Sequence, residues 1–528
     1  MYWRRSTGRS DVLAKRGMVA TSQPLAAQTG ISILQQGGNA IDAAVATAAV
    51  LDVVEPFSTG CGGDAFALIH LPGLSEPLSF NGSGRSGSLV SLDELREKNW
   101  TEMPQRGGPT VTVPGAMHLW WHLIQNYGSL EFSDILAPAI HYARNGFPVS
   151  QIIAEQWGLV APVLRNEYAK EVFTLDGSAP VFGQIMRNVD LADTFEKVSS
   201  EGIEEFYKGD IAEKIIDTVQ RDDGYLTRDD LAAHQTKETS PISTNYRGID
   251  VFEHPPNGQG FAALAMLNIM REFDISSLGS ISMERYHIMI EAKKLAYADL
   301  YTHNADPSKY DIPLEKILSS DYGRNRASLI DVTNVMRNPM SGIKLGEDTV
   351  FLVTADSEGR AVSFINSLYM GFGSGLAVPG TGIKLQNRGH LFSLEPNHPN
   401  CIAPRKLPFH TIIPGALYHD NDFFGVFGIM GGSHQAQAHG QVVSNIVDFS
   451  MSPQEALDFP RFHHNQQNNT VSLENGIFPG IQGSLRKLGH LLTHETMSNF
   501  GGGQAILKRK DVWVAGSDYR KDGLAIGY

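Results

Sequence analysis

The chain has 528 residues, and 42% of them are hydrophobic, which is enough for a sizeable core in one large α/β body or in several domains. Acidic residues outnumber basic ones by 57 to 43, the formal charge is −14, and no long run of Lys or Arg occurs. Nucleic acid is therefore not expected as a partner, because phosphate binding needs a basic face. The only two cysteines, Cys61 and Cys401, exclude a disulfide framework and favour a reducing compartment.

The amino-terminal 22 residues contain basic side chains but lead into no apolar segment of the kind found in a signal peptide. The alanine-rich run near residues 40–54 is interrupted by Asp42 and Asp52 and is too short to cross a bilayer. We therefore expect a soluble, cytoplasmic protein with no membrane partner.

A strand and two helices are predicted near the amino terminus. The strand covers residues 17–22, and the first helix covers 24–36, where a pair of glycines ends it. Asn39 can cap the second helix, over 40–54, whose alanines permit close packing. A glycine-rich turn then leads into another strand over the residues after Gly63, and no side chain in this block is an obvious acid or base.

The middle of the chain is predicted to be mainly helical. Thr227 and Asp230 form a cap-and-helix signal. Residues 291–299 have the pattern of an amphipathic helix whose charges are solvated. Residues 331–348 are polar and include a proline and a glycine, so an exposed linker is predicted there.

A hairpin is predicted directly after this linker. Residues 349–354 are mostly β-branched or aromatic, with apolar side chains on both faces, as in a strand that is covered on both sides. A turn signal then leads into a returning strand over 361–368. A hairpin centred on that turn sets Thr349 opposite Asn366 or Ser367, which brings two hydroxyls close together at one end of the sheet.

A glycine pair later in the chain joins a strand to a helix. The strand is predicted over 423–430, Gly431 and Gly432 break it, and Ser433 opens a helix that runs toward Phe449. Such a joint exposes backbone N–H groups at a helix N-terminus, where negative charge is favoured. A tight turn without a binding role would use the same glycines.

Two further segments of this half contain histidine. Residues 403–411 are predicted to precede a strand that ends at 414–416. The histidine pair at 463–464 has no carboxylate or cysteine partner at ligand spacing, so no metal site is predicted.

Four blocks of sequence carry a resemblance to a known family. They are GGNAIDAAVA at 37–46, EPFSTGCGGDAF at 55–66, residues 349–388 with FGSG at 372–375, and GSDYRKDGLAIGY at 516–528. With these blocks the chain resembles, over nearly its whole length, the gamma-glutamyltransferase family (gamma-glutamyltranspeptidases or glutathione hydrolases) of the N-terminal-nucleophile hydrolases.

The resemblance implies a fold and a division of the chain. The expected fold is an α/β (α+β) four-layer αββα sandwich, in which two stacked and largely antiparallel sheets are flanked by helices. Cleavage between Asp348 and Thr349 would give a large segment, 1–348, ending in the linker 331–348, and a small segment, 349–528. These two fragments would stay together as one intertwined body, a heterodimer.

The resemblance also implies a mechanism without a cofactor or a metal. The Thr349 hydroxyl attacks the preceding carbonyl during maturation, and it later attacks the substrate, with the new α-amine of Thr349 as the base. Ser367 stands where the family has a threonine that contacts this amine, so it is expected to orient Thr349. The N–H groups of Gly431 and Gly432 are expected to form the oxyanion hole.

The substrate is expected to be a small-molecule amide or a peptide. Substrate binding is assigned by the resemblance to five side chains: Arg85, Tyr369, Arg388, His410 and Thr411. Arg85 is interpreted either as a ligand for a carboxylate of the acyl group or as a partner in a loop salt bridge. Leu391 stands where gamma-glutamyl enzymes have the carboxylate that pairs with the amine of the donor.

Three functions follow as hypotheses. The first is an autoprocessed hydrolase or acyltransferase that cleaves gamma-glutamyl amides such as glutathione and passes the acyl group to water or an amine. The second is an acylase for another acyl group, such as the glutaryl group handled by cephalosporin acylases, because Arg388 suits a dicarboxylic acyl group without an amine. The third is a binding protein on the same fold that has lost catalysis.

Overall fold

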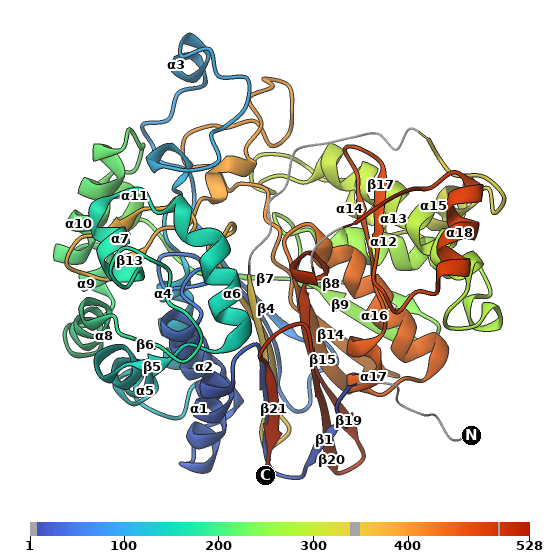
Figure 1. Ribbon diagram of the computed structural model, residues 1–528, viewed down its shortest axis with the longest axis horizontal. Helices are drawn as coiled ribbons and strands as arrows, with labels where there is room; N and C mark the ends of the chain where they lie inside the picture. The colour runs from blue at the N-terminus through green and yellow to red at the C-terminus, as the bar shows by residue number, and fades with distance from the viewer. Residues whose placement is uncertain (1–7, 338–348, 495–496) are drawn as a thin grey trace.

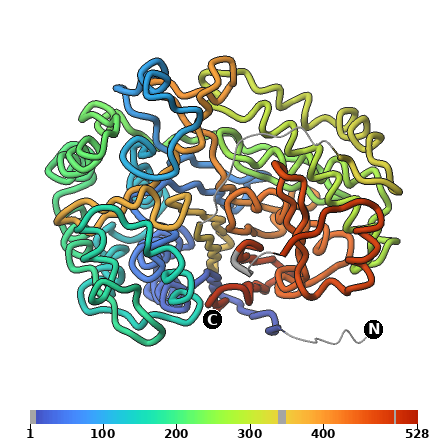
Figure 2. The backbone as a smooth tube through the Cα atoms, turned by 45° about the horizontal axis from the view of Figure 1, so that its top comes forward, coloured from blue at the N-terminus to red at the C-terminus, as the bar shows by residue number. Residues whose placement is uncertain are grey.

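The computed structural model describes residues 8–337, 349–494 and 497–528 (Figure 1). Two large sheets stand face to face in the middle of the molecule, and helices cover the outer side of each (Figures 1 and 2). The predicted four-layer αββα sandwich is therefore confirmed. Asp348 and the second half of the predicted linker lie outside the described residues.

One sheet contains the predicted hairpin and is called the hairpin sheet here. Its strand order is β21-β2-β10-β11-β3-β4-β7. In that order the strands are Leu524–Gly527, Met18–Thr21, Val350–Ala355, Ala361–Ser367, Asp64–His70, Leu78–Gly82 and Lys237–Thr239. All neighbouring strands are antiparallel.

The other sheet is called the covering sheet, with the order β1-β20-β19-β15-β14-β9-β8. In that order its strands are Val12–Ala14, Val512–Ser517, Gly502–Arg509, Asp422–Met430, Gly415–His419, Ile249–Glu253 and Ile242–Tyr246. They too are antiparallel throughout. Both sheets combine strands from before residue 348 with strands from after it, so the two segments are interleaved, while their division at 348/349 stays a prediction.

Short strands outside these sheets are β5 (Phe147–Pro148), β6 (Ile185–Met186), β12 (Ala377–Val378), β13 (Ile383–Lys384), β16 (Phe462–Asn465), β17 (Thr470–Leu473) and β18 (Leu491–Thr493).

Separate groups of helices cover the two sheets (Figure 1). On the side of the hairpin sheet lie α1 (Pro24–Gln35), α2 (Ala40–Val54), α4 (Ala116–Tyr127), α5 (Phe132–Asn145), α6 (Gln151–Val160), α7 (Glu167–Phe173), α8 (Val189–Glu201), α9 (Glu204–Tyr207), α10 (Asp210–Arg221) and α11 (Arg228–Ala232). On the side of the covering sheet lie α12 (Gly260–Met270), α13 (Met283–His303), α14 (Leu314–Ile317), α15 (Ser320–Ala327), α16 (His434–Phe449), α17 (Pro453–Asp458) and α18 (Pro479–Leu488). Helix α3 (Leu92–Glu97) projects from one end.

The capping signals act as expected. The Asn39 side chain accepts hydrogen bonds from the N–H groups of Ile41 and Asp42, at 2.8 and 3.1 Å, and the Asp42 carboxylate accepts one from the N–H of Asn39 at 2.8 Å. This is a complete capping box at the start of α2. Thr227 and Asp230 form a second capping box at the start of α11.

The prediction of a strand that ends at 414–416 was wrong, because β14 begins at Gly415. The residues before it donate their N–H groups to groups outside a sheet ladder: Phe409 to the Asn400 side chain, His410 to the carbonyl of Asn257, and Ile413 to the side chain of Gln435. With its donors used in this way, the segment is not part of a sheet ladder.

The prediction that the charges of residues 291–299 are solvated was wrong. In α13, Glu291 and Lys294 expose 1% of their side chains each, and Lys294 Nζ lies 2.7 Å from Glu291 Oε1. The N–H of Met336 donates to the same carboxylate at 2.9 Å, and Lys294 donates to the Met336 carbonyl at 3.1 Å. Residues 331–337 thus cover this face of α13, which the sequence pattern could not reveal.

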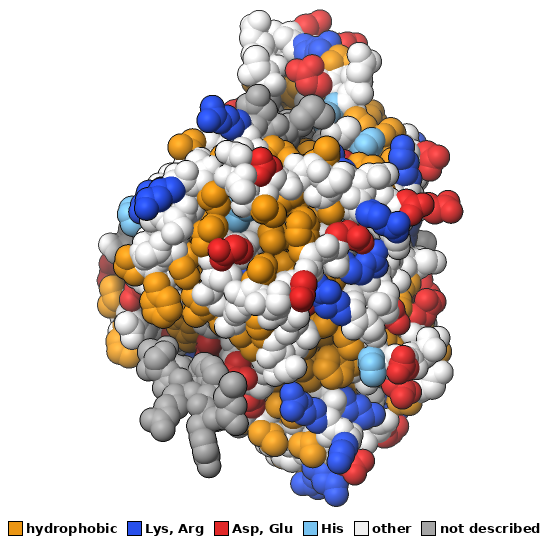
Figure 3. Space-filling view, turned by 90° about the vertical axis from the view of Figure 1, so that its right-hand side faces the viewer, with side chains coloured by type: hydrophobic (Ala, Val, Ile, Leu, Met, Phe, Trp, Pro, Cys, Tyr) orange, Lys and Arg blue, Asp and Glu red, His pale blue; other side chains and the backbone are white. Residues whose placement is uncertain are grey.

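Charged side chains of both signs are interspersed with apolar ones on the face of the molecule shown in Figure 3. Within the described ranges, no helix combines the length and the apolar character that crossing a membrane requires.

We expect that breaking the buried ion pair between Glu291 and Lys294 strongly lowers the stability of the protein. Glu291→Gln leaves a buried lysine without its carboxylate, so we expect a loss of about 3–5 kcal/mol in the free energy of unfolding. Lys170 and Glu167 provide a matched control, with the same spacing and the same 2.7 Å contact but 47% and 90% exposure. Glu167→Gln should cost at most about 0.5 kcal/mol. Urea unfolding of both variants checks this, and equal shifts in midpoint would contradict the interpretation.

Candidate active site

The register of the hairpin sheet arranges four side chains in a row at one end of the sheet. Val350 pairs with Asn366, so Thr349, one residue earlier, lies opposite Ser367. Ser367 in turn pairs with Asp64. Since Ala65 pairs with Gly82, Asp64 lies opposite Ser83. Neighbouring strands are about 4.8 Å apart, so the row from Thr349 to Ser83 spans about 14 Å.

This row faces the covering sheet. Along β10, Val350 and Leu352 pack into the core under the helices, whereas Phe351 and Val353 pack into the core between the two sheets. Because side chains alternate along a strand, Thr349 points to the side of Phe351, between the sheets. It exposes 2% of its surface in the uncleaved chain.

A hydrogen-bond network surrounds the Thr349 hydroxyl. Its Oγ1 lies 3.1 Å from Ser367 Oγ. The Ser367 oxygen accepts hydrogen bonds from the N–H of Tyr369 at 2.9 Å and from Arg388 Nη2 at 3.0 Å. These two donors use both lone pairs of Ser367, so its own hydrogen has to be donated, and Thr349 Oγ1 is within its reach.

The covering sheet contributes Gln435, in the first turn of α16. Its Nε2 lies 3.4 Å from Thr349 Oγ1, and its Oε1 accepts the N–H of Ile413 at 3.1 Å. Gln435 was not predicted. Its only signal in the sequence is its place three residues after the glycine pair.

The glycine pair lies between β15 and α16, as predicted. Gly431 has φ 125° and Gly432 has φ 49°, a backbone conformation that side chains with a Cβ rarely adopt. The Gly432 carbonyl accepts a hydrogen bond from Gln259 Nε2 at 2.8 Å, and the same amide group also donates to the Thr411 carbonyl. In the hydrogen bonds between described residues, neither glycine N–H is a donor. The oxyanion hole stays a prediction, and this geometry leaves both donors available for it.

Arg388 lies behind Ser367 and is fully buried. Besides Ser367, it donates from Nη1 to Thr411 Oγ1 at 2.7 Å, and its guanidinium lies 4.6 Å from the centre of the Tyr369 ring. Burial lowers the pKa of Arg388 to about 10, so the group is still charged at neutral pH. Three of the predicted binding residues, Tyr369, Arg388 and Thr411, are therefore in direct contact.

His410 is paired with Asp64, and both are buried. Nε2 of His410 lies 3.0 Å from Oδ2 of Asp64. Burial holds the pKa of His410 well below its usual range, so the ring is neutral. Burial also raises the pKa of Asp64 to about 7, against the opposing effect of the Arg388 charge. The sequence showed no obvious acid or base in this block, because the pattern of a strand residue does not reveal that Asp64 lies near the Arg388 charge.

Arg85 does not join this cluster. Its Nη1 lies 2.7 Å from Asp306 Oδ2 and 2.9 Å from the Arg405 carbonyl. The salt-bridge interpretation thus describes its contact, and Arg85 lines a separate pocket. Leu391 is buried in the apolar core under the helices of the covering sheet.

Another cluster has side chains of the kind that bind metals. Atoms of His287, Glu291 and His490 lie within 4.8 Å of one another. Glu291 is already paired with Lys294, and His287 Nδ1 lies 2.8 Å from His490 Nε2. A metal ion would have to displace these contacts. Both cysteines are unpaired and buried, and burial raises the pKa of the Cys61 thiol well above its usual value.

Comparisons with known proteins match this geometry to one family. The family model described as Gamma-glutamyltranspeptidase matches residues 26–528. The glutathione hydrolase-like YwrD proenzyme of Bacillus subtilis is 36% identical, over 98% of this chain and 99% of the relative. The oxamate amidohydrolase proenzyme of Klebsiella pneumoniae is 32% identical, over 98% of this chain and 100% of the relative.

A solved structure agrees with the sequence relatives. The crystal structure of a cephalosporin acylase from Bacillus halodurans is 40% identical and has a TM-score of 0.93, covering 100% of this chain and 98% of that one. These relatives are named for different amides, and two of them are proenzymes. The chain therefore belongs to the gamma-glutamyltranspeptidase family, and it is an autoprocessing amide hydrolase with an N-terminal nucleophile.

Proposed function

We propose that the chain cuts itself between Asp348 and Thr349, and that the mature enzyme hydrolyses amides whose acyl group carries a carboxylate but no neighbouring amine. The observation that carries this proposal is Arg388, a buried cation one hydrogen bond from Ser367 and two from Thr349. The division into segments 1–348 and 349–528 belongs to the same proposal.

Maturation and turnover use the same hydroxyl. In maturation, Thr349 Oγ1 attacks the carbonyl of residue 348, the peptide bond becomes an ester, and water hydrolyses that ester to leave Thr349 with a free α-amine. In turnover, Oγ1 gives its proton to this amine and forms an acyl ester, the leaving amine takes the proton, and water releases the acid. An α-amine with a reference pKa of about 7.7–8.0 is sufficiently basic for this role near neutral pH.

The network around Thr349 supports this assignment. Ser367 Oγ and Gln435 Nε2 both lie within hydrogen-bond distance of Oγ1 and hold it in position, and in the mature enzyme its proton would pass to the α-amine. The N–H groups of Gly431 and Gly432 would bind the oxyanion, an effect worth about 3–4 kcal/mol per donor in acyl transfer. Gln259 holds the Gly432 carbonyl and thereby fixes the orientation of this turn.

Arg388 is the reason for proposing an acyl group that carries a carboxylate. Its hydrogen bonds go to the hydroxyls of Ser367 and Thr411, and among the described residues it forms no ion pair. Asp64, whose pKa is raised to about 7, balances the buried Arg388 charge only in part at neutral pH, so an acyl carboxylate at this position gains a charge-assisted, bidentate partner. The oxamate amidohydrolase and cephalosporin acylase relatives support an acyl group other than gamma-glutamyl.

The gamma-glutamyl group, as in glutathione, is the second candidate. One observation favours it: Asp64 places a carboxylate in the site, where it can pair with the amine of a gamma-glutamyl donor while Arg388 binds the carboxylate. Leu391 argues against it, because an apolar side chain at that position leaves the amine without the partner expected there.

Removal of the Thr349 hydroxyl tests the nucleophile. Thr349→Ala should stay a single chain and cleave no amide, whereas Thr349→Ser should yield fragments starting at residues 1 and 349, more slowly than wild type. Mass spectrometry of the purified proteins gives the fragment ends. Fragments from Thr349→Ala, or full activity of an intact wild-type chain, would refute the mechanism. A wild type that matures but cleaves no amide would favour the binding-protein hypothesis.

A panel of anilides tests the acyl group. With matured protein we expect kcat/KM for the glutaryl anilide to exceed that for the butyryl anilide about 100-fold, because a hydrogen-bonded charge contributes about 1.5–3 kcal/mol. Arg388→Gln should reduce this ratio to about threefold or less, and Arg388→Lys should keep part of it, since lysine has the charge but not the planar fork. Rates are expressed per mole of matured enzyme. Preference for the gamma-glutamyl anilide would decide for the second candidate.

The pKa of Asp64 predicts how binding depends on pH. Below about pH 7 Asp64 is protonated and neutral, so the Arg388 charge acts alone. Above it the Asp64 carboxylate offsets part of that charge, so the inhibition constant of glutarate should rise on the order of tenfold from pH 6 to pH 8. Asp64→Asn should flatten this dependence while His410 stays neutral throughout. An unchanged slope in Asp64→Asn would contradict the assignment.

A further inference from the structure

A tyrosine of α13 holds the backbone at the start of α16. The Tyr297 hydroxyl donates a hydrogen bond to the carbonyl of Ser433 and accepts one from the N–H of Gln437 at 3.2 Å. Ser433 and Gln437 are four residues apart, so the hydroxyl contacts both backbone groups that a first helical turn would join. Ser433 is also the residue directly after the glycine pair, so Tyr297 contacts the end of the turn formed by residues 431–433, called the glycine turn here.

Two planar peptide units connect this hydroxyl to the N–H of Gly432. The first unit joins the Ser433 carbonyl to the N–H of His434, and that N–H donates to the Gly431 carbonyl at 2.8 Å. The second unit joins the Gly431 carbonyl to the N–H of Gly432. In a trans peptide the carbonyl and the N–H point in opposite directions, so a bond that fixes one of them also fixes the other. The hydrogen bond from Tyr297 therefore helps to set the direction of the Gly432 N–H.

The glycine turn depends on such hydrogen bonds because its glycines have no Cβ to restrict their rotation. Gln259 Nε2 holds the Gly432 carbonyl at 2.8 Å, but this carbonyl belongs to the peptide unit after the one that contains the Gly432 N–H. The ring of His434 gives no support, since both of its nitrogens are buried without a hydrogen-bond partner among the described residues. The unit with the Gly432 N–H is thus held through the Gly431 carbonyl.

The ring of Tyr297 is itself held in place. It is buried in α13, with 1% of the residue exposed. Nζ of Lys293 lies 3.9 Å from the centre of the ring and donates to the His464 carbonyl at 2.9 Å. The ring of Tyr301 lies against the same ring, with the two centres 5.8 Å apart. The hydroxyl is therefore presented to Ser433 from a fixed position.

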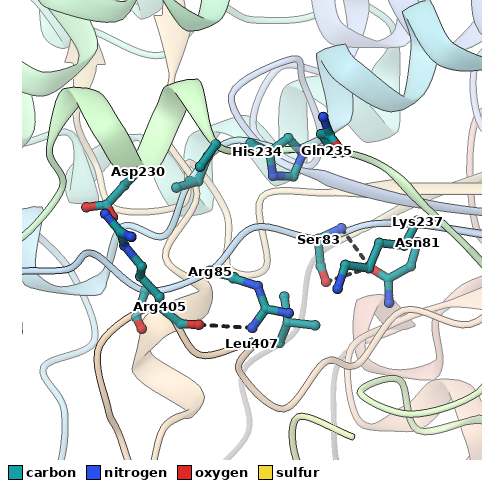
Figure 4. A pocket seen from close by; sticks show the side chains of 12 residues that line it. Asn81, Ser83, Arg85, Asp230, His234, Gln235, Lys237, Arg405 and Leu407 are labelled. Carbon is teal, nitrogen blue, oxygen red and sulfur yellow. Dashed lines mark hydrogen bonds and ion pairs between the residues drawn. The ribbon is translucent and has the colours of Figure 1, made fainter. Parts of the chain in front are cut away.

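We propose that Tyr297 is a positioning residue for the oxyanion hole, because it keeps the N–H of Gly432 directed at the oxyanion. This rests on the proposed function, in which the two glycine N–H groups bind the oxyanion beside Thr349. Each hydrogen bond in such a chain polarises the next, so the Tyr297 hydroxyl also makes the Gly432 N–H a stronger donor. Tyr297 does not line the pocket of about 240 Å³ shown in Figure 4, so loss of its hydroxyl leaves the walls of that pocket unchanged.

Tyr297→Phe tests the proposal, because it removes the hydroxyl and keeps the ring. With matured protein and glutaryl anilide we expect kcat to fall about tenfold, less than the 10²–10³-fold loss for a deleted oxyanion-hole donor. KM should stay within about twofold, since an interaction that matters only in the transition state lowers kcat and leaves ground-state binding unchanged.

Tyr286→Phe is the matched control. Tyr286 lies on the same helix, exposes 1% of its surface, and donates to the carbonyl of Pro460 at 3.0 Å. Each variant loses one buried hydrogen bond from a tyrosine to a carbonyl, so both should lower the urea midpoint to a similar extent. Only Tyr297→Phe should lose kcat. An unchanged kcat in Tyr297→Phe, or an equal loss in both variants, would overturn the proposal.

A boronic acid gives a second measurement that responds to the oxyanion hole. In 4-boronobutanoate, boron replaces the acyl carbon of the glutaryl group. Thr349 Oγ1 adds to boron, its proton passes to the α-amine, and the tetrahedral boronate places an oxygen where the oxyanion would lie. The inhibition constant should rise about tenfold in Tyr297→Phe and stay within about twofold in Tyr286→Phe. Equal inhibition constants in wild type and Tyr297→Phe would contradict the role of Tyr297.

Failure of the proposed function gives a different pattern, because wild type alone decides it, whereas the difference between the two tyrosine variants decides this inference. If only gamma-glutamyl anilide is cleaved, the same comparison uses that anilide and 2-amino-4-boronobutanoate. If no amide is cleaved, calorimetric titration with both boronates replaces the kinetics. Binding that is weakened in Tyr297→Phe but not in Tyr286→Phe supports the inference. Equal binding by all three proteins, or no binding by wild type, refutes it.

Discussion

The pairing of β10 with β11 sets the geometry of the candidate active site, because it decides which side of the sheet carries the Thr349 hydroxyl. Side chains alternate with a period of two, so a slip by one residue would turn Thr349 toward the helices and away from Ser367. The observed register instead puts Thr349, Ser367 and Asp64 side by side, facing the covering sheet. Apolar residues on both faces of β10 hold that register in place, since a slip would disturb the cores on both sides of the strand.

The covering sheet and the helix that follows β15 supply further groups around the Thr349 hydroxyl. The turn at Gly431 and Gly432 follows β15, and Gln435, three residues further on, lies 3.4 Å from the Thr349 hydroxyl. Gln259 connects this turn to the segment that carries Thr411. Side chains from separate stretches of sequence thus support one hydroxyl, and each is held by a buried hydrogen bond, which is the preorganisation that acyl transfer needs.

Several cationic side chains lie along the same edge of the hairpin sheet as Thr349. Arg388 supplies a buried cation close to Thr349, and Arg85, Lys237 and Arg405 surround a pocket further along. Relatives that share the fold are named for glutathione hydrolase-like, oxamate and cephalosporin chemistry, so the scaffold alone does not choose the substrate. Under the proposed function, specificity resides in the side chains around Arg388.

Local patterns were enough to predict the cap at Asn39, a hairpin that sets Thr349 opposite Asn366 or Ser367, and the glycine pair between β15 and α16, and the strand register then selected Ser367. Each of these depends on neighbouring residues and on periodicity, which a sequence displays directly. Only the tertiary structure decided the burial of Glu291 and Lys294, the contact of Gln435 with Thr349, and the raised pKa of Asp64. Those properties depend on desolvation and on partners far away in the chain, such as Met336 and Arg388, and no local pattern records which distant groups will cover a side chain.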